Sequence, residues 1–339
     1  MSRIPTLDGW RGIAIALVLF DHVQYAFLGR FSQPWMQTGQ HGVTIFFVLS
    51  GFLITSKFLE GPIDLRSFYI RRVFRLLPVA WTYLAVLLIL GLMSHATIAA
   101  PSAVLASLIF YRNYVLVDNG VSTWHFWSLS LEEQFYLVWP CVLLLAGLRR
   151  CRWIALAGVV CCATYRLLFW TYYNRDFFNC RSQVRADALL VGCLLAIAFR
   201  EPRMLAWISK WSKSWALPAL VMLNYFIARF HLLPPLGEIL CIAALISSSV
   251  LHPNSLFAQP LTSRVLSTLG VVSYSVYVWQ ELFMLFAPKN STAGIFFHFV
   301  TVSLCALGSY EYIERPMIRL GHKLTHQHAT QTKEISSAA

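Results

Sequence analysis

The chain has 339 residues, of which 58% are hydrophobic, 15% aromatic and only 12% charged, whereas a soluble domain carries about 25% charged residues. Together with a mean hydropathy of +0.60, this composition excludes a soluble globular protein and a disordered one. A transmembrane helix needs about 20 apolar residues, so the chain has room for at most about a dozen spans and for no large soluble domain beside them.

The net charge is +12, from 27 Lys and Arg residues against 15 Asp and Glu residues. These basic residues lie between apolar runs, which is the positive-inside pattern of a polytopic membrane protein, so we expect no nucleic-acid partner. The 8 cysteines form no CxxC pair and mostly lie in apolar runs. We interpret them as reduced core residues and expect no metal site.

Ten apolar runs are predicted to span the membrane. In chain order they are residues 10–28, 41–59, 76–95, 127–148, 153–171, 187–199, 215–230, 237–251, 265–287 and 293–314. The first run has no small-residue cleavage site and carries Asp21 and His22, so it is predicted to be a retained span and not a signal peptide.

Residues 102–117 are short and contain Arg112, and the distribution of charge decides how they are placed. If the N-terminus is cytoplasmic and residues 102–117 do not span the membrane, most of the 27 basic residues lie on the cytoplasmic side. Only eight lie on the outer side or within spans near it: Arg30, Arg112, Arg166, Arg175, Arg181, Arg185, Arg229 and Lys289. A span at 102–117 would reverse that bias. We therefore predict an all-α bundle of about ten transmembrane helices with 96–126 as a partly buried loop.

This topology places both termini in the cytoplasm and the protein in the plasma (inner) membrane. Residues 1–321 are predicted to form the membrane domain, and residues 322–339 a polar tail. The tail carries His322, His326 and His328, and we interpret it as a solvated segment.

Arg11 and His22 are the first candidate functional residues, because an ionisable group inside a bilayer is costly. Eleven residues make three turns of helix plus about 20°, so both side chains share one face, with a rise of roughly 16 Å between them. A cation at the cytoplasmic rim and a base near the midplane favour a long anionic ligand. Asp21 lies about 100° around the helix from His22, so we expect it to pair with another helix.

A second candidate element comes at the cytoplasmic start of the third span. Arg71, Arg72 and Arg75 are spaced to share one side of a helix, and guanidinium groups bind phosphate oxygens in a bidentate manner. Positive-inside anchoring is the alternative explanation for these residues. We predict that the three arginines hold the phosphates of an anionic donor.

Glu132 and Glu133 open the fourth span, where the helix dipole tolerates a carboxylate. The functional alternative is that Glu132 faces the bundle interior and holds an imidazole, a bound hydroxyl or Arg185. Arg185 and Asp187 are two residues apart and do not face each other on a helix, so each is predicted to pair across helices.

Gly42, Ser50 and Gly51 are predicted to serve close helix packing, and Glu314 and Arg315 to end a helix.

These motifs together resemble acyltransferase family 3, polytopic membrane enzymes that acylate bacterial surface glycans and some secreted metabolites. The resemblance runs almost from end to end of the chain and rests on residues 7–14 with His22, on 43–55, 68–78, 127–136, 185–192 and 273–277, and on 314–316. One departure is Gln280, where many members carry a histidine. Another is the lack of the hydrolase-like domain fused to some members, so we expect this chain to act alone or with a partner.

The resemblance implies transfer of an acyl group, most often acetyl, from cytoplasmic acyl-CoA to a hydroxyl group of a glycan, a lipid-linked sugar or a related acceptor. Our interpretation of the residues agrees: Arg72 and Arg75, with Arg71, would hold the nucleotide phosphates, and the pantetheine arm would pass Arg11 toward His22. His22 would then be the general base. Arg185, Ser128 or Ser130 would stabilise the oxyanion, and Asp187 is a further residue expected at the substrate site.

Two alternatives of other classes remain open. A proton-coupled secondary transporter would also carry ionisable residues at the midplane, although it has no need of an arginine pair that binds phosphates. A degenerate scaffold is disfavoured because His22, Arg72, Arg75 and Glu132 are all present. The outer loops 29–40, 96–126 and 172–185 are rich in Trp, Tyr and Arg, and we expect them to select the acceptor.

Overall fold

The computed structural model describes residues 4–24, 38–61, 64–94, 98–115, 121–169, 180–212, 235–286 and 291–325. Within these ranges all regular secondary structure is helical, as predicted. The α-helices are α1 (Pro5–Val23), α2 (Thr38–Phe58), α3 (Leu65–Ser94), α4 (Pro101–Leu108), α5 (Phe126–Phe169), α7 (Ser182–Ala198), α8 (Pro202–Ser212), α10 (Pro235–Leu251), α11 (Arg264–Met284) and α12 (Thr292–Ser309).

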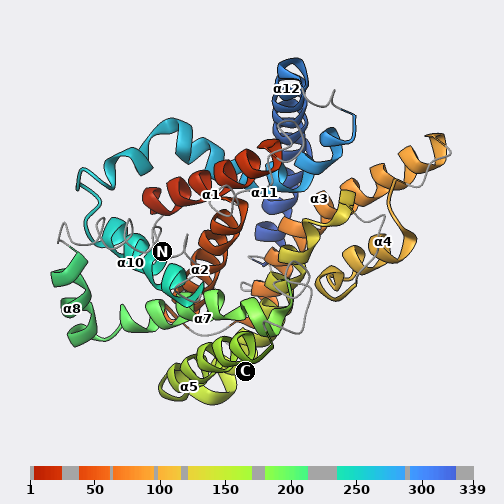
Figure 1. Cartoon of the computed structure of the whole chain (residues 1–339). Helices are drawn as coiled ribbons and strands as arrows, with labels where there is room; N and C mark the ends of the chain where they lie inside the picture. The colour runs from red at the N-terminus through yellow and green to blue at the C-terminus, as the bar shows by residue number, and fades with distance from the viewer. Residues whose placement is uncertain are drawn as a thin grey trace, which may run out of the picture.

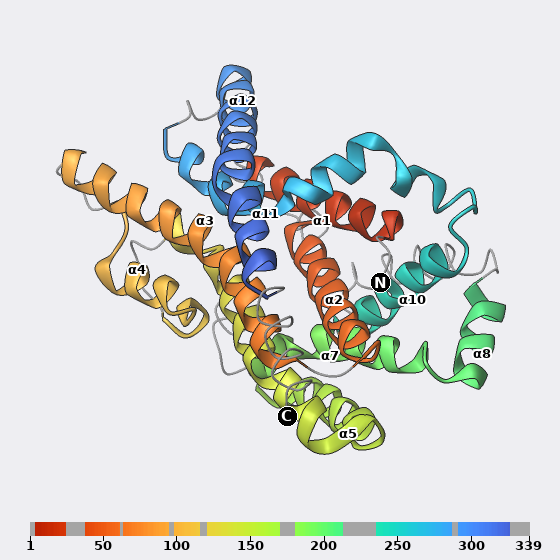
Figure 2. The same cartoon turned by 180° about the vertical axis from the view of Figure 1, so that it is seen from behind.

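Helices α1, α2 and α11 form the centre of the bundle, with α3 and α4 on one side and α8 and α10 on the other (Figures 1 and 2). Glycines let these helices approach backbone to backbone. A Cβ at Gly12 would overlap the Leu266 carbonyl oxygen of α11, and a Cβ at Gly42 would overlap the Ala14 carbonyl oxygen of α1. Gly51 meets Leu189 of α7 in the same way. The predicted packing role of Gly42 and Gly51 is thus confirmed.

The segment between α3 and α5 does not cross the bundle. Its helix α4 has 8 residues and is therefore about 12 Å long, too short for a hydrocarbon core of about 30 Å. Arg112 follows in a 3-10 turn and is fully buried, donating from Nε to Thr123 Oγ1 at 3.1 Å and from Nη1 to the Val115 carbonyl. The prediction of a partly buried loop that does not span is confirmed for its described residues.

Helix α5 has 44 residues, but the chain reverses within it, so it consists of two helical segments. Gly147 has φ 71° and ψ 164°, which is not helical. The Cys151 thiol lies 3.4 Å from the Val142 carbonyl oxygen, nine residues earlier, whereas nine residues of straight helix would separate them by about 13 Å. Two antiparallel segments therefore meet at Gly147, as the two predicted spans 127–148 and 153–171 require.

Four helical segments of the described chain are long and apolar enough to cross a membrane: Thr38–Phe58, Leu65–Ser94, Phe126–Phe169 and Thr292–Thr325. The pair α7 and α8, bent by 110°, makes a fifth if it counts as one span. The last segment continues through a π-helical turn, Tyr310–Glu314, and runs past the domain boundary expected at 321/322. All eight cysteines are free.

Several expectations fall outside the described residues. They concern the predicted span 215–230, the histidines of the tail beyond residue 325, and most of the outer loops 29–40 and 172–185. The ends of several predicted spans fall there as well.

Candidate functional site

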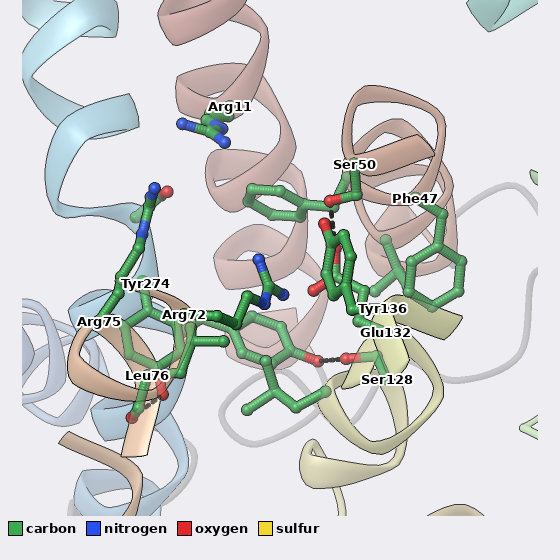
Figure 3. Close-up of a pocket in the computed structure, with 15 residues that line it drawn as sticks. Arg11, Phe47, Ser50, Arg72, Arg75, Leu76, Ser128, Glu132, Tyr136 and Tyr274 are labelled. Atoms are coloured by element: carbon green, nitrogen blue, oxygen red, sulfur yellow. Dashed lines mark hydrogen bonds between the residues drawn. The ribbon is translucent and has the colours of Figure 1, made fainter. Parts of the chain in front are cut away.

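A pocket with an empty volume of about 670 Å³ lies between α1, α2, α3, α5 and α11 (Figure 3). Its lining combines charged groups with hydroxyl-bearing and aromatic side chains: Arg11, Val43, Phe46, Phe47, Ser50, Arg72, Arg75, Leu76, Ser128, Leu129, Glu132, Tyr136, Ser273, Tyr274 and Tyr277. Five predicted site residues, Arg11, Arg72, Arg75, Ser128 and Glu132, are thus brought to one cavity from three helices.

Positive charge dominates this lining, because three arginines face one carboxylate. Arg75 is an electrostatic neighbour of Arg11, and Figure 3 shows the two on the same side of the pocket. Two half-buried guanidinium groups held close together repel each other. Such a site favours an anion that lies between them.

Arg72 is held by a carboxylate next to the pocket. Its Nε and Nη2 both donate to Glu133 Oε1, at 2.9 and 2.6 Å, and its guanidinium carbon lies 3.4 Å from the centre of the Tyr136 ring. The Nη1 group makes neither of these two bonds. Arg72 is therefore fixed in position while it keeps donors for a ligand.

Glu132 accepts a hydrogen bond from the Ser50 hydroxyl. Its carboxylate is also in electrostatic range of Arg72 and Arg11. Within the described ranges its hydrogen-bond partner is thus Ser50, while Arg185 donates to Thr44; the predicted roles of Glu132 stay predictions. Ser50, expected to serve helix packing, instead lines the pocket because its hydroxyl faces the start of α5.

Ser128 and Tyr277 both line the pocket, and their hydroxyl oxygens are 2.6 Å apart. Tyr277 also donates to the His125 carbonyl oxygen at 3.0 Å. One turn earlier on α11, the Tyr274 hydroxyl donates to the Leu76 carbonyl oxygen of α3 at 2.7 Å (Figure 3). These bonds tie α11 to α3 and α5 on two sides of the cavity.

Five predicted site residues do not line the pocket: His22, Arg71, Ser130, Arg185 and Asp187. His22 stands eleven residues along α1 from Arg11, which places it about 16 Å away along the helix axis. The Arg71 guanidinium Nε is buried and has no hydrogen-bond partner among the described residues. The predicted roles of these five residues remain predictions.

The partners of the last three residues indicate how they support the bundle. Asp187 of α7 forms a buried ion pair with Arg166 of α5, and Arg185 donates to Thr44 of α2 at 3.0 Å. Both therefore pair across helices, as predicted. Ser130 donates to the Phe126 carbonyl oxygen and accepts from the Arg112 backbone amide, so it anchors the buried loop to α5.

Asp21 is engaged with another helix, as predicted. The backbone amides of Thr38 and Gly39 hydrogen-bond its carboxylate, which satisfies free N–H groups at the start of α2. His22 is half-buried, and its Nδ1 has no hydrogen-bond partner among the described residues.

Sequence reasoning missed the three pocket tyrosines, Tyr136, Tyr274 and Tyr277. All three lie within motifs already singled out, so the available signal was their spacing: 274 and 277 share one face of α11 at i and i+3. Within the described ranges, no group of three or more His, Cys, Asp or Glu side chains forms a potential metal site.

Comparison with known proteins decides the family. Residues 4–309 match the protein family described as "Acyltransferase domain". The chain belongs to this acyltransferase family. The acyltransferase domain is 30% identical to the "Putative peptidoglycan O-acetyltransferase YrhL" of Bacillus subtilis (strain 168), over 94% of this chain and 56% of that protein. It is 27% identical to the "O-acetyltransferase OatA" of Staphylococcus aureus (strain NCTC 8325 / PS 47), over 94% of this chain and 58% of that protein.

The acyltransferase domain thus spans a little over half the length of these curated relatives. No solved structure matches it. Its apolar helices and its family membership together indicate a multi-pass membrane protein.

Proposed function

We propose that this chain is a membrane O-acyltransferase that moves an acyl group, acetyl by preference, from acyl-CoA to a hydroxyl group of a glycan, a lipid-linked sugar or a related acceptor. The observation that supports it most is the cationic pocket. Arg11, Arg72 and Arg75 converge there beside aromatic rings, a lining suited to phosphates at one end and to an uncharged arm at the other.

In this proposal Arg75 and the free donors of Arg72 bind the phosphates of the donor, with Arg71 contributing from the cytoplasmic end of α3. Tyr136 supports Arg72 from below its guanidinium plane. The acyl-bearing arm then runs along α1, past Arg11 and toward His22. This direction follows the face that Arg11 and His22 share.

His22 acts as general base in the proposed reaction. It accepts the proton of the acceptor hydroxyl while that oxygen attacks the thioester carbonyl, and the tetrahedral oxyanion forms. The carbon–sulfur bond then breaks, and the proton passes from His22 to the departing thiolate, which leaves as the CoA thiol. Such a base contributes about 10²–10⁴-fold to rate, and Ser128 is the predicted oxyanion donor that lines the pocket.

Direct transfer requires fewer states than an acyl-enzyme intermediate on His22, and we adopt it. Rapid mixing of the protein with labelled acetyl-CoA, before any acceptor is added, separates the two routes. Label that appears on His22 at this stage would replace direct transfer by a two-step mechanism.

In this proposal the chain crosses the bacterial inner membrane ten times, and both of its termini lie in the cytoplasm. The donor pocket then opens toward the cytoplasm and the acceptor is met from the opposite side. Because the Bacillus relative is named as a putative peptidoglycan O-acetyltransferase, cell-wall glycan is the first acceptor to test.

The deciding experiment measures CoA thiol release by the purified protein in nanodiscs, with acetyl-CoA and a glycan extract. We expect His22→Ala to lower turnover about 10²-fold or more while acetyl-CoA still binds. Loss of charge-assisted hydrogen bonds in Arg72→Ala/Arg75→Ala should weaken acetyl-CoA binding at least tenfold. Arg152→Ala, which removes an exposed arginine paired with Glu201, is the matched control. Absence of binding and turnover with every acyl-CoA tried would overturn the proposal.

A further inference from the structure

Helix α8 lies at the edge of the bundle (Figures 1 and 2), and none of its residues lines the pocket. It follows α7 after a bend of 110°, so it cannot continue in the direction of α7. With 11 residues it is about 16 Å long, too short for a hydrocarbon core of about 30 Å. Helix α8 therefore runs across α7 and adds no crossing of its own.

The start of α8 lies at the same end of the bundle as the turn at Gly147 in α5. Arg152, which follows that turn, pairs with Glu201, the residue before α8, and their Nη1 and Oε2 atoms are 3.2 Å apart. The turn joins two antiparallel segments and carries the exposed Arg149 and Arg150. Because charged side chains are costly inside the hydrocarbon core, this turn and the start of α8 belong at the membrane surface.

One face of α8 is docked on the end of α10. The Ser212 hydroxyl oxygen lies 3.0 Å from His252 Nε2, and the Ser248 hydroxyl donates to the Ser212 carbonyl oxygen at 2.9 Å. Ile208, one turn earlier on the same face, packs against the apolar core. These contacts fix the rotation of α8 about its axis, so the directions of its remaining faces are fixed as well.

A second face of α8 is apolar and exposed. Met204, Trp207 and Trp211 are three and four residues apart and form one row along the helix. They are 42%, 60% and 58% exposed, and the centres of the two indole rings are 6.3 Å apart. Tryptophan is enriched at the membrane–water interface, because its ring has an apolar body and a polar N–H group.

A third face of α8, next to this row, carries positive charge. Arg203 and Lys210 are seven residues apart, which places them on the same side of the helix, and both are exposed. Within the described ranges neither residue belongs to an ion pair. An uncompensated basic face beside an apolar row with tryptophan is typical of a helix that lies on a bilayer containing anionic lipids.

The surroundings of α8 favour lipid as the occupant of the apolar row. Leu145 and Trp153 lie on either side of the turn at Gly147 and are 83% and 59% exposed. They belong to a helix that is apolar enough to cross a membrane. The apolar row of α8 thus lies at the same end of the bundle as a surface suited to contact with acyl chains.

We propose that α8 is an interfacial helix that binds the headgroups of anionic phospholipids. Arg203 and Lys210 contact the phosphates, and the row from Met204 to Trp211 enters the boundary between headgroups and acyl chains, to a depth of about 5–10 Å. The site is separate from the donor pocket. The proposal goes beyond acyl transfer and does not depend on it.

The first test uses the whole chain in nanodiscs and follows the fluorescence of Trp207 and Trp211. Because the chain has 12 tryptophans, the signal of these two is the difference between wild type and Trp207→Phe/Trp211→Phe. We expect brominated lipids to quench this signal, and bromine near the headgroup end of the acyl chain to quench it more than bromine near the bilayer centre. The opposite order overturns the proposal. So does an unquenched signal, the result for a face that meets water or a second copy of the chain.

The second test measures headgroup selectivity with the same two tryptophans. Competition between brominated phosphatidylglycerol and unlabelled phosphatidylcholine, and the converse pair, gives the relative affinity of the two lipids next to α8. One basic residue near an anionic surface is worth about fivefold. We therefore expect a preference for the anionic lipid of up to about 25-fold at low salt, and its loss in Arg203→Gln/Lys210→Gln.

The matched control is Arg319→Gln/Lys323→Gln, which also removes one exposed arginine and one exposed lysine but leaves α8 intact. Its lipid preference at the two tryptophans should equal that of the wild type. Equal affinity of the wild type for both lipids, or the same loss in both charge variants, overturns the headgroup site on α8. All these substitutions are at exposed positions, so wild-type melting temperatures are expected. If Trp207→Phe/Trp211→Phe melts lower, Trp211→Phe alone supplies the difference signal.

Discussion

Arg72 donates two hydrogen bonds to a single carboxylate oxygen of Glu133, at 2.9 and 2.6 Å. The carboxylate therefore does two opposing things. It orients Arg72 over the Tyr136 ring, and it adds a negative charge beside a pocket proposed to bind phosphates.

Replacing Glu133 separates these two effects. Glu133→Gln keeps an oxygen acceptor and removes the charge, so we expect acetyl-CoA to bind roughly 3- to 10-fold more tightly. The partly buried pair loses about 1–3 kcal/mol of stability. Isothermal titration and a thermal melt measure both quantities. Weaker acetyl-CoA binding would mean that orientation of Arg72 outweighs repulsion.

Close contact between α2 and α7 makes Gly51 intolerant of a side chain. A Cβ there would overlap the Leu189 carbonyl oxygen, and overpacking of this kind costs about 1–3 kcal/mol or more. Gly51→Ala should lower the melting temperature in detergent. Gly308→Ala, in α12, has no neighbour within 4 Å and should instead gain up to about 1 kcal/mol from helix propensity. Equal melting temperatures for the two variants would contradict the contact.

The ion pair between Arg166 and Asp187 is buried, with side chains 3% and 0% exposed. Removing one partner leaves an uncompensated charge and costs about 3–5 kcal/mol. We expect Arg166→Met and Asp187→Leu each to destabilise the protein strongly and the double variant to recover much of the loss. A double-mutant cycle on unfolding free energy tests this. Additive losses would instead favour separate roles, including the substrate role predicted for Asp187.

Asp64 precedes α3, the helix that carries Arg72 and Arg75. Hydrogen bonds from the Ser67 side chain and backbone amide hold the pKa of the Asp64 carboxyl below its usual value, and the backbone bond caps the helix at 3.0 Å. A lowered pKa means that this stabilisation is complete above about pH 4 and is lost as the pH falls through the lowered value.

Asp64→Ala should therefore cost about 0.5–2 kcal/mol near neutral pH, with a smaller difference from wild type in acid. Asp64→Asn keeps the cap and should lose the pH dependence of that contribution. Melting temperatures measured from pH 7 to pH 3 check both variants. A constant difference between Asp64→Ala and wild type across that range would show that Asp64 does not titrate as a cap.

Much of the architecture could be predicted because apolar length and charge bias are local properties of the sequence. Arg11 and Glu132 were singled out as charged residues in apolar spans, Arg72 and Arg75 by their spacing on one helix face, and Ser128 as an oxyanion candidate. All five line one pocket. The same reasoning identified the short buried loop around Arg112.

Pairings between distant residues could not be predicted in this way. His125 and Glu281, whose Nδ1 and Oε2 atoms lie 2.9 Å apart, are 156 positions apart along the chain, and which carboxylate meets which histidine depends on how α5 and α11 rotate against each other. Likewise, nothing in the spacing of residues 132 and 133 indicates that the first meets Ser50 and the second Arg72. Helix rotation is set by the packing of the whole bundle.

Helix α1 is continuous from Pro5 to Val23, and backbone contacts at Gly9, Gly12 and Gly42 clamp it between α2, α11 and the turn that precedes α11. These contacts fix the position of α1, so the separation of roughly 16 Å between Arg11 and His22 is fixed as well. In the proposed reaction, a donor must have the correct reach between its phosphates and its thioester carbonyl. The side chains beyond His22 then select between short and long acyl chains, and this selection does not depend on the residues that bind the nucleotide.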